Sequence, residues 1–251
     1  MAAKLFQVHG SHPCAAVRKA LDLKGIDYKL VEFPPPFHMP YQRLRTGSRT
    51  VPSVKFDDGE VVSGSSAIMR RIDRMVAEPP LFGSPAVEEA ERWGEVTLQP
   101  IARSLLWGAF GRSPASMVAY QQGGKLPPLP RPVVLALAPV IGRIERKVNN
   151  ATEDQQRADL AALPGYLDVV DGYLAEGVIG GATPNAADLQ IASTLRLLMT
   201  LADLRPLIAS RPAGALALRI WPDHPGEVPA GTFPANWVPA NSASSAASLA
   251  G

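Results

Sequence analysis

A pair of short strands joined by a tight turn, between residues 49 and 68, constrains the fold of this chain more than any other segment. Asp58-Gly59 separates two runs that contain β-branched residues, and both turn residues tolerate the positive φ that a type I′ turn requires. We therefore predict that Ser53–Phe56 and Glu60–Ser63 pair as an antiparallel hairpin.

The residues that flank this hairpin predict one side of a ligand pocket. A cis bond before Pro52 would turn the main chain of Val51 outward, where it can bind an extended, peptide-like ligand as an added strand. After the hairpin, Gly64-Ser65-Ser66 precedes a run with helical spacing over residues 65–77. Ser65 would lie at the helix N-terminus, where N–H groups and the helix dipole attract a carboxylate. The alternative is an ordinary hairpin that leads into a helix, with hydroxyls that only cap it.

The composition indicates a globular protein without a nucleic-acid partner. The chain has 251 residues, 46% of them apolar, and its mean hydropathy is +0.02, so it can hold one large domain or two modest ones. The 25 basic and 23 acidic residues give a net charge of +2, which is too balanced for nucleic-acid binding. No apolar run reaches the roughly 18 residues of a membrane helix, and no signal peptide is recognisable. We expect a cytoplasmic protein with no membrane partner.

The first 78 residues read as a compact α/β domain. Pro13 suits the first turn of a helix that ends at Gly25. The expected order is strand, helix, strand, irregular Pro-rich connector, hairpin and helix; the two strands before the hairpin cover residues 4–8 and 26–32, and the connector covers residues 33–48. A βαβ unit followed by ββα is typical of such a domain.

Beyond a linker at residues 78–83, the pattern is helical over residues 84–222. We predict helices at 86–110, 132–149, 154–176 and 186–203, and no convincing strand. Asn185 and Asp188 fit a capping box, and the helix that they begin is apolar on nearly all sides, so it should be the buried centre of a bundle. Residues 223–251 are rich in Pro, Gly, Ser and Ala, and we expect a partly disordered tail.

Four segments together resemble the glutathione S-transferase family. Gly10-Ser11-His12-Pro13-Cys14 is similar to the glycine, serine, x, proline, cysteine pattern of its serine-type, delta- and theta-like members. Thr50-Val51-Pro52 resembles their cis-proline signature, and Gly64-Ser65-Ser66-Ala67-Ile68 resembles their glutamate, serine, x, alanine, isoleucine signature. Asn185 to Asp188 is similar to the family's folding box. The resemblance implies a thioredoxin-like α/β N-terminal domain followed by an all-α C-terminal bundle.

The same resemblance implies a transferase that uses glutathione, or another low-molecular-weight thiol, as co-substrate. It implies that Ser11 activates the thiol and that a second set of residues binds it: Arg49, Val51, Pro52, Ser65 and Ser66. A homodimer, a small-molecule electrophile and a role in detoxification follow from it as well. Two positions depart from the pattern, since Arg49 stands where many members have His, Lys or Gln, and Gly64 where many have glutamate. Arg49 can grip a carboxylate with two hydrogen bonds, whereas Gly64 removes an anionic partner for the ligand's ammonium group.

Ser11 would stabilise a thiolate rather than attack the substrate itself. A free thiol has a pKa of about 8.5, so only a few per cent is ionised at pH 7. One hydrogen bond to the charged sulfur is worth roughly 1.5–3 kcal/mol, which lowers the thiol pKa by about one to two units. The alternative for Ser11 is a simple helix cap.

Cys14 is the only cysteine, which excludes an intramolecular disulfide and a cysteine-based zinc site. We predict no metal site. Because a cysteine in the first turn of a helix can be ionised and reactive, Cys14 is the competing nucleophile. A buried and inert Cys14 is the other interpretation.

The electrophile pocket should lie between the loop after the first strand and the first long helix of the second domain. Its candidate residues are His12, Pro13, Leu106, Trp107 and Phe110, although the apolar ones also fit a helical core. The leading function is thiol transfer to an electrophile. A thiol-dependent isomerase, dehalogenase or peroxidase on the same scaffold is the second interpretation, and a non-catalytic binding or scaffold protein is the third.

Overall fold

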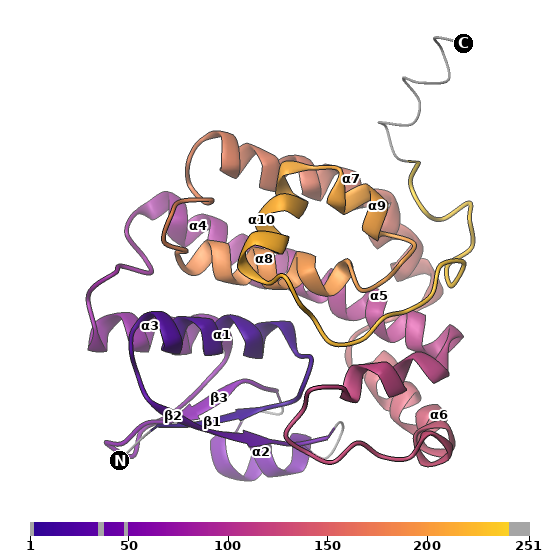
Figure 1. The fold of residues 1–251 in the computed structure, drawn as a ribbon, viewed down its shortest axis with the longest axis horizontal. Coiled ribbons are helices and arrows are strands. Elements are labelled where there is room, and N and C mark those ends of the chain that lie inside the picture. Colours follow the sequence, from indigo (N-terminus) through magenta and orange to yellow (C-terminus); the bar gives the residue numbers. More distant parts are fainter. Residues whose placement is uncertain (1–2, 35–37, 48–49, 241–251) are drawn as a thin grey trace.

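The computed structural model describes residues 3–34, 38–47 and 50–240, and its first part is a four-stranded sheet with helices on both faces (Figure 1). In chain order the elements are β1 (Ala3–Gln7), α1 (His12–Leu23), β2 (Tyr28–Glu32), α2 (His38–Thr46), β3 (Ser53–Lys55), β4 (Val61–Ser63) and α3 (Ser65–Met75). The strand order is β2-β1-β3-β4, with β1 parallel to β2 and antiparallel to β3. Helices α1 and α3 lie on one face and α2 on the other. This is the predicted thioredoxin-like domain.

The hairpin forms in the predicted register. Ser53 pairs with Ser63 and Lys55 with Val61. Gly59 in the turn has a φ of 91°, a conformation that favours glycine, but Asp58 does not have a positive φ, so the expected type I′ turn was wrong. The bond between Val51 and Pro52 is cis, as predicted. The hairpin therefore leads directly from the cis-proline loop to the start of α3.

The connector between β2 and β3, predicted to be irregular, contains the helix α2, so the prediction was wrong over residues 38–46. The helix buries two polar side chains, His38 and Gln42, rather than an apolar stripe. Gln42 Oε1 accepts a hydrogen bond of 2.6 Å from Ser53 Oγ on β3, which ties the helix to the sheet. A helix that buries polar residues has no apolar period to detect.

The second part of the chain is a bundle of helices, again as predicted. Its elements are α4 (Pro85–Trp93), the π-helical turn η1 (Gly94–Leu98), α5 (Gln99–Arg112), the 3₁₀ segment η2 (Pro114–Gln121), α6 (Arg131–Val148), α7 (Glu153–Ala175), α8 (Ala186–Leu198), α9 (Arg205–Ala209) and α10 (Pro212–Ile220). The predicted helix at 86–110 is thus interrupted by a π turn, and the one at 186–203 ends earlier. Helices α9 and α10 are short, begin with prolines at Pro206 and Pro212, and were not predicted.

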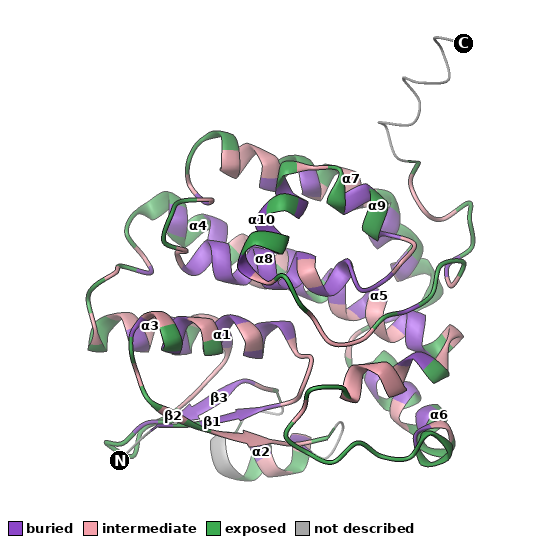
Figure 2. Ribbon diagram, viewed as in Figure 1, coloured by how far each residue is buried: buried purple, intermediate pink, exposed green. Residues whose placement is uncertain are grey.

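Helix α8 is the buried centre of this bundle, as its sequence predicted (Figure 2). The capping box is present: Asn185 Oδ1 accepts from Asp188 N over 3.0 Å, and Asp188 Oδ2 accepts from Asn185 N over 3.0 Å. Helix α8 packs against α4 and α10 and also against α1 of the first domain. The two domains therefore share one continuous core.

A buried ion pair fixes the junction between the domains. Lys24 Nζ lies 2.7 Å from Asp73 Oδ1 and donates to the carbonyl oxygen of Val76 over 2.6 Å, at the end of α3. Asp73 also accepts from the backbone N–H of Leu81, over 2.8 Å. The carbonyl oxygen of Leu81 in turn accepts from Ala186 N at the start of α8, over 2.9 Å. Leu81 of the linker is thus hydrogen-bonded to α3 through its N–H and to α8 through its C=O.

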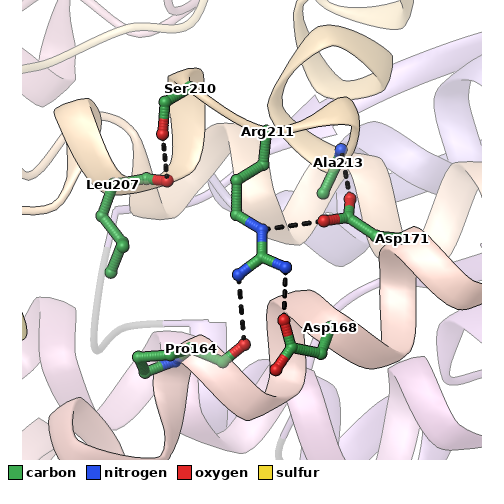
Figure 3. A network of polar contacts seen from close by, with 7 residues as sticks. All are labelled: Pro164, Asp168, Asp171, Leu207, Ser210, Arg211 and Ala213. Carbon is green, nitrogen blue, oxygen red and sulfur yellow. Dashed lines mark hydrogen bonds and ion pairs between the residues drawn. The ribbon is translucent and has the colours of Figure 1, made fainter. Parts of the chain in front are cut away.

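Helix α10 is anchored to α7 by a single arginine (Figure 3). Arg211 Nε donates to Asp171 Oδ2 over 2.7 Å, and Arg211 Nη2 contacts Asp168 Oδ1. The second oxygen of Asp171 accepts from Ala213 N over 2.8 Å, so one carboxylate also caps the N-terminus of α10.

Residues 223–240 lie against the end of α8. Val228 N donates to Thr200 O over 2.9 Å, and Val228 O accepts from Ala202 N over 3.0 Å. The carboxylate of Asp203 accepts from Gly231 N and Phe233 N. The remainder of the predicted tail, residues 241–251, lies outside the described residues. Within the part of the chain that the structure covers, no helix is long and apolar enough to cross a bilayer.

Candidate functional site

A cavity of about 1000 Å³ lies between the two domains, beside the N-terminus of α1. Its walls come from the loop after β1, the cis-proline loop, the start of α3, and α5, η2 and α6. Most of the residues predicted for the two halves of the site line it together: Ser11, His12, Pro13, Val51, Pro52, Ser65, Leu106, Trp107 and Phe110. The structure therefore places the predicted thiol half-site and the predicted electrophile half-site next to each other.

Two predicted residues that the structure describes, Ser66 and Cys14, do not contribute to these walls. Arg49 lies outside the described residues. Ser66 is not among the lining residues, and its hydroxyl donates to Glu91 Oε2 over 3.0 Å. Cys14 is 1% exposed and also does not line the cavity.

Ser11 stands at the N-cap position of α1, but its side chain makes no capping hydrogen bond. Ser11 therefore occupies the cap position, but its hydroxyl does not cap the helix. Its hydroxyl contacts the thiol of Cys14 instead. Ser11 faces the cavity at the N-terminal end of a 12-residue helix, where the helix dipole favours negative charge.

Cys14 is a protonated thiol at neutral pH. Burial raises its pKa to about 11, and the hydrogen bond from Ser11 offsets this effect only in part. Because the thiolate is the nucleophilic form, a thiol with this pKa is inert. The structure supports the buried and inert interpretation of Cys14.

The cis-proline loop and the start of α3 form one continuous edge of the cavity. Gly64 N donates to the carbonyl oxygen of Pro52 over 3.0 Å, and Gly64 has a φ of 92°. Ser65 Oγ accepts from Gln190 Nε2 over 3.1 Å and from Gln99 Nε2 over 3.3 Å. A hydroxyl oxygen has two acceptor sites, and both are used here. The Ser65 hydroxyl therefore has only its O–H left to donate to a ligand.

Several polar residues of the cavity wall were not predicted from the sequence, and three of them lie on one helical face. Glu95, Gln99 and Arg103 recur every four residues along η1 and α5 and line the cavity. Arg103 Nη1 donates to Gln99 Oε1 over 2.9 Å. Burial lowers the pKa of Arg103, and the charge of Glu95 opposes that shift. The four-residue spacing of polar residues on an otherwise buried helix was the available signal.

Two histidines of the cavity wall, His12 and His38, are neutral at neutral pH. His12 is 2% exposed, and burial together with the nearby positive charge of Arg103 lowers its pKa well below the usual value. Its Nε2 has no hydrogen-bond partner among the described residues. Burial lowers the pKa of His38 to about 4. Neither ring adds a positive charge to the site at neutral pH.

The far wall of the cavity is aromatic and aliphatic. The rings of Trp107 and Phe110 lie 5.3 Å apart, and those of Phe110 and Tyr120 lie 4.9 Å apart, both edge to face. The Tyr120 hydroxyl is bonded to Thr200 Oγ1 over 2.5 Å, which points this polar group away from the open space. Helix α6 adds Val134, Leu137, Ile141 and Val148. This half of the cavity is suited to an apolar molecule.

The chain thus combines a thioredoxin-like domain that contains a cis-proline loop with a helical bundle, and a cavity lies between the two. Residues 5–80 match the sequence family described as the N-terminal domain of glutathione S-transferase. A comparison with curated protein sequences gave no match. No cluster of metal-ligating side chains is present among the residues that the structure describes.

Solved structures share the fold over most of their length. A glutathione S-transferase from Rhodospirillum rubrum is 19% identical, with a TM-score of 0.55 over 94% of this chain and 97% of that one. One from Sinorhizobium meliloti is 17% identical, with a TM-score of 0.56 over 88% of each chain. A glutathione transferase from Phanerochaete chrysosporium is 18% identical, with a TM-score of 0.57 over 88% of this chain and 97% of that one. The match to the N-terminal domain family covers residues 5–80, and the solved structures show that the two-domain fold is shared.

Proposed function

We propose that this protein is a glutathione-dependent transferase in which Ser11 stabilises the thiolate. The observation that carries the proposal is the Ser11 hydroxyl, which makes no capping bond at the N-terminus of α1 and lines a cavity shared by the cis-proline loop and Ser65. A thiol placed there meets one hydroxyl donor and the positive end of a helix. Together these favour the thiolate by roughly 2–4 kcal/mol.

The thiol-binding half of the cavity fits a small peptide with a free carboxylate. The main chain of Val51 would pair with the peptide portion as an added strand. The O–H of Ser65 and the N–H groups at the start of α3 would bind the carboxylate. Arg49, from the resemblance alone, would add a second cation. Of the two predicted serines, we assign the hydroxyl contact to Ser65, because that of Ser66 already donates to Glu91.

The reaction would join the sulfur to an electrophilic carbon in the apolar half of the cavity. The thiolate attacks, a carbon–sulfur bond forms, and the leaving group departs with the electron pair of its own bond. The protein supplies orientation, the thiolate and exclusion of water. The homodimer implied by the resemblance and the cytoplasmic location expected from the sequence are parts of the same proposal, and light scattering tests the dimer.

Replacing Ser11 by Ala tests the role of its hydroxyl. We expect the pKa of bound glutathione, followed by thiolate absorbance, to rise by about one to two units and turnover to fall accordingly. Cys14→Ala tests the competing nucleophile, and turnover should persist in this variant, because a protonated thiol outside the cavity is not the attacking group. An unaltered thiolate pKa in Ser11→Ala would remove Ser11 from the mechanism. Absence of glutathione binding in calorimetry at millimolar concentration would exclude the enzyme altogether.

A further inference from the structure

Arg103 is a cation of the cavity wall that forms no ion pair within 4 Å with a carboxylate of the described residues. Its only hydrogen bond among the described residues runs from Nη1 to Gln99 Oε1, over 2.9 Å. The charge of Glu95, which lines the same cavity, acts on Arg103 without a direct contact. A guanidinium has five N–H donors in a planar fork. Most of that fork is free to bind a ligand.

An unpaired charge in a partly buried wall is costly. Removing a cation from water without an anionic partner disfavours it, and the lowered pKa of Arg103 reflects that penalty. The neighbouring histidine, His12, is neutral and cannot compensate. An anion that entered the cavity would recover this penalty and form short, charge-assisted bonds with the fork.

Arg103 lies at the boundary between the two halves of the cavity. On one side its partner Gln99 bonds Ser65 of the thiol half. On the other side Leu106 and Trp107 follow on the same helix and begin the apolar wall. The electrostatic effect of Arg103 on His12 shows that the guanidinium is also close to the start of α1, beside Ser11. An anionic group bound to Arg103 would hold the adjoining apolar body next to the sulfur.

We propose that the electrophile used by this protein is a carboxylate-bearing, largely apolar molecule whose carboxylate is bound by Arg103. The inference rests on the proposed transferase function and adds the substrate class. Carboxylates occur on both the acceptor and glutathione, so the test has to separate these two sources.

A pair of matched acceptors, 4-chloro-3-nitrobenzoate and 4-chloro-3-nitrobenzamide, makes this separation. In both, the thiolate adds to the carbon that bears chlorine, the carbon–sulfur bond forms, and chloride leaves with the electron pair of the broken bond. Arg103→Met should lower kcat/KM about 10- to 100-fold for the benzoate and less than about threefold for the benzamide. Arg103→Lys should restore part of the loss, because it keeps the charge but not the fork. Arg92→Met, an exposed position on α4 away from the cavity, is the control and should change neither rate.

Two results would overturn the proposal. The first is an equal loss of both rates in Arg103→Met. The second is a weakening of glutathione binding, measured by calorimetry, by the same factor as the benzoate rate, since that would assign the fork to the thiol.

A binding measurement without thiol keeps this test independent of turnover. The wild-type protein should bind 3-nitrobenzoate at least tenfold more tightly than 3-nitrobenzamide, and Arg103→Met should abolish the difference. If the wild-type protein bound 3-nitrobenzoate more tightly but turned over neither chlorinated acceptor, the anion site would stand and the transferase function would be excluded. Equal binding of the two compounds by the wild-type protein would exclude the anion site itself.

Discussion

The side-chain amide of Gln190, in the buried centre of the helical bundle, donates to Ser65 Oγ in the other domain over 3.1 Å. The two residues are 125 positions apart in sequence. Together with Gln99, Gln190 occupies the acceptor sites of the hydroxyl and so orients its O–H. A residue that never meets the ligand thereby controls a group that we expect to bind it.

Replacing Gln190 by Leu should weaken glutathione binding about fivefold, because the loss of one hydrogen bond costs about 1 kcal/mol. Calorimetry on Gln190→Leu, Ser65→Ala and the double variant measures the coupling between them. Because Gln190 is expected to act only through Ser65, the double variant should bind no more weakly than Ser65→Ala. Additive losses would show instead that Gln190 acts elsewhere.

Replacing Lys24 by Met should destabilise the protein by about 1–3 kcal/mol, because the half-buried carboxylate of Asp73 and the carbonyl oxygen of Val76 would lose their charged donor. Urea unfolding measures the change. Arg71→Met is the matched control: it also removes ion pairs, to Asp58 and Glu60, but these lie at the surface. The control should cost less than about 1 kcal/mol. Similar losses in the two variants would contradict the structural role of Lys24.

The carboxyl group of Glu91 should make stability depend on pH. Burial raises its pKa from 4.5 to about 7, with the hydrogen bond from Ser66 opposing the shift. A carboxyl group with a raised pKa in the folded state favours folding while it is protonated. That contribution is complete below pH 4.5 and is lost as the pH rises through about 7.

Glu91→Gln tests this dependence. Unfolding by urea between pH 5 and 8 should show a loss of up to about 3 kcal/mol in the wild-type protein that is smaller in the variant. Parallel pH profiles of the two proteins would mean that Glu91 ionises normally in the folded state.

Replacing Gly226 by Ala should both destabilise the protein and disturb the cavity. Gly226 has a φ of 88°, and a Cβ there would lie 2.4 Å from Cγ of Tyr120, which lines the cavity. We expect a loss of about 2–4 kcal/mol, from backbone strain and overpacking together. Gly231→Ala isolates the strain alone, since its φ is 79° and no atom lies within 4 Å of the added Cβ. Equal melting temperatures for the two variants would contradict the contact with Tyr120.

Much of the fold follows from local signals in the sequence. Asp58-Gly59 indicates a hairpin and Asn185 with Asp188 a helix start, because each depends on backbone geometry within four residues. Helix α2 was missed because it buries His38 and Gln42 through contacts with the sheet, and polar side chains produce no apolar period. The short helices α9 and α10 depend on Arg211 reaching α7, a contact that no local pattern indicates.

The candidate site was predictable where it resembles a known pattern and not where it depends on distant contacts. Ser11, Val51 and Ser65 stand in recognisable signatures. Arg103 was missed because a charged residue on a helix usually marks a solvated face. Only the packing of α5 against the first domain turns that face toward a cavity. The bond from Gln190 to Ser65 joins segments that have no relation in sequence.

The contacts made by Lys24 and Asp73 also determine which residues belong structurally to the first domain. Leu81 follows the cis bond between Glu78 and Pro79. Its N–H donates to Asp73, and its carbonyl oxygen accepts from Ala186 N. A cut at residue 78 would leave the half-buried carboxylate of Asp73 without its backbone donors, Leu81 N and Phe82 N, and Ala186 N at the start of α8 without its acceptor. A chimaera that combines this first domain with another helical bundle has to keep Leu81 with the first domain. The new bundle has to supply an N–H donor for the carbonyl oxygen of Leu81. The helical bundle, which we propose binds the acceptor, is therefore not a unit that can be separated from the first domain at residue 78.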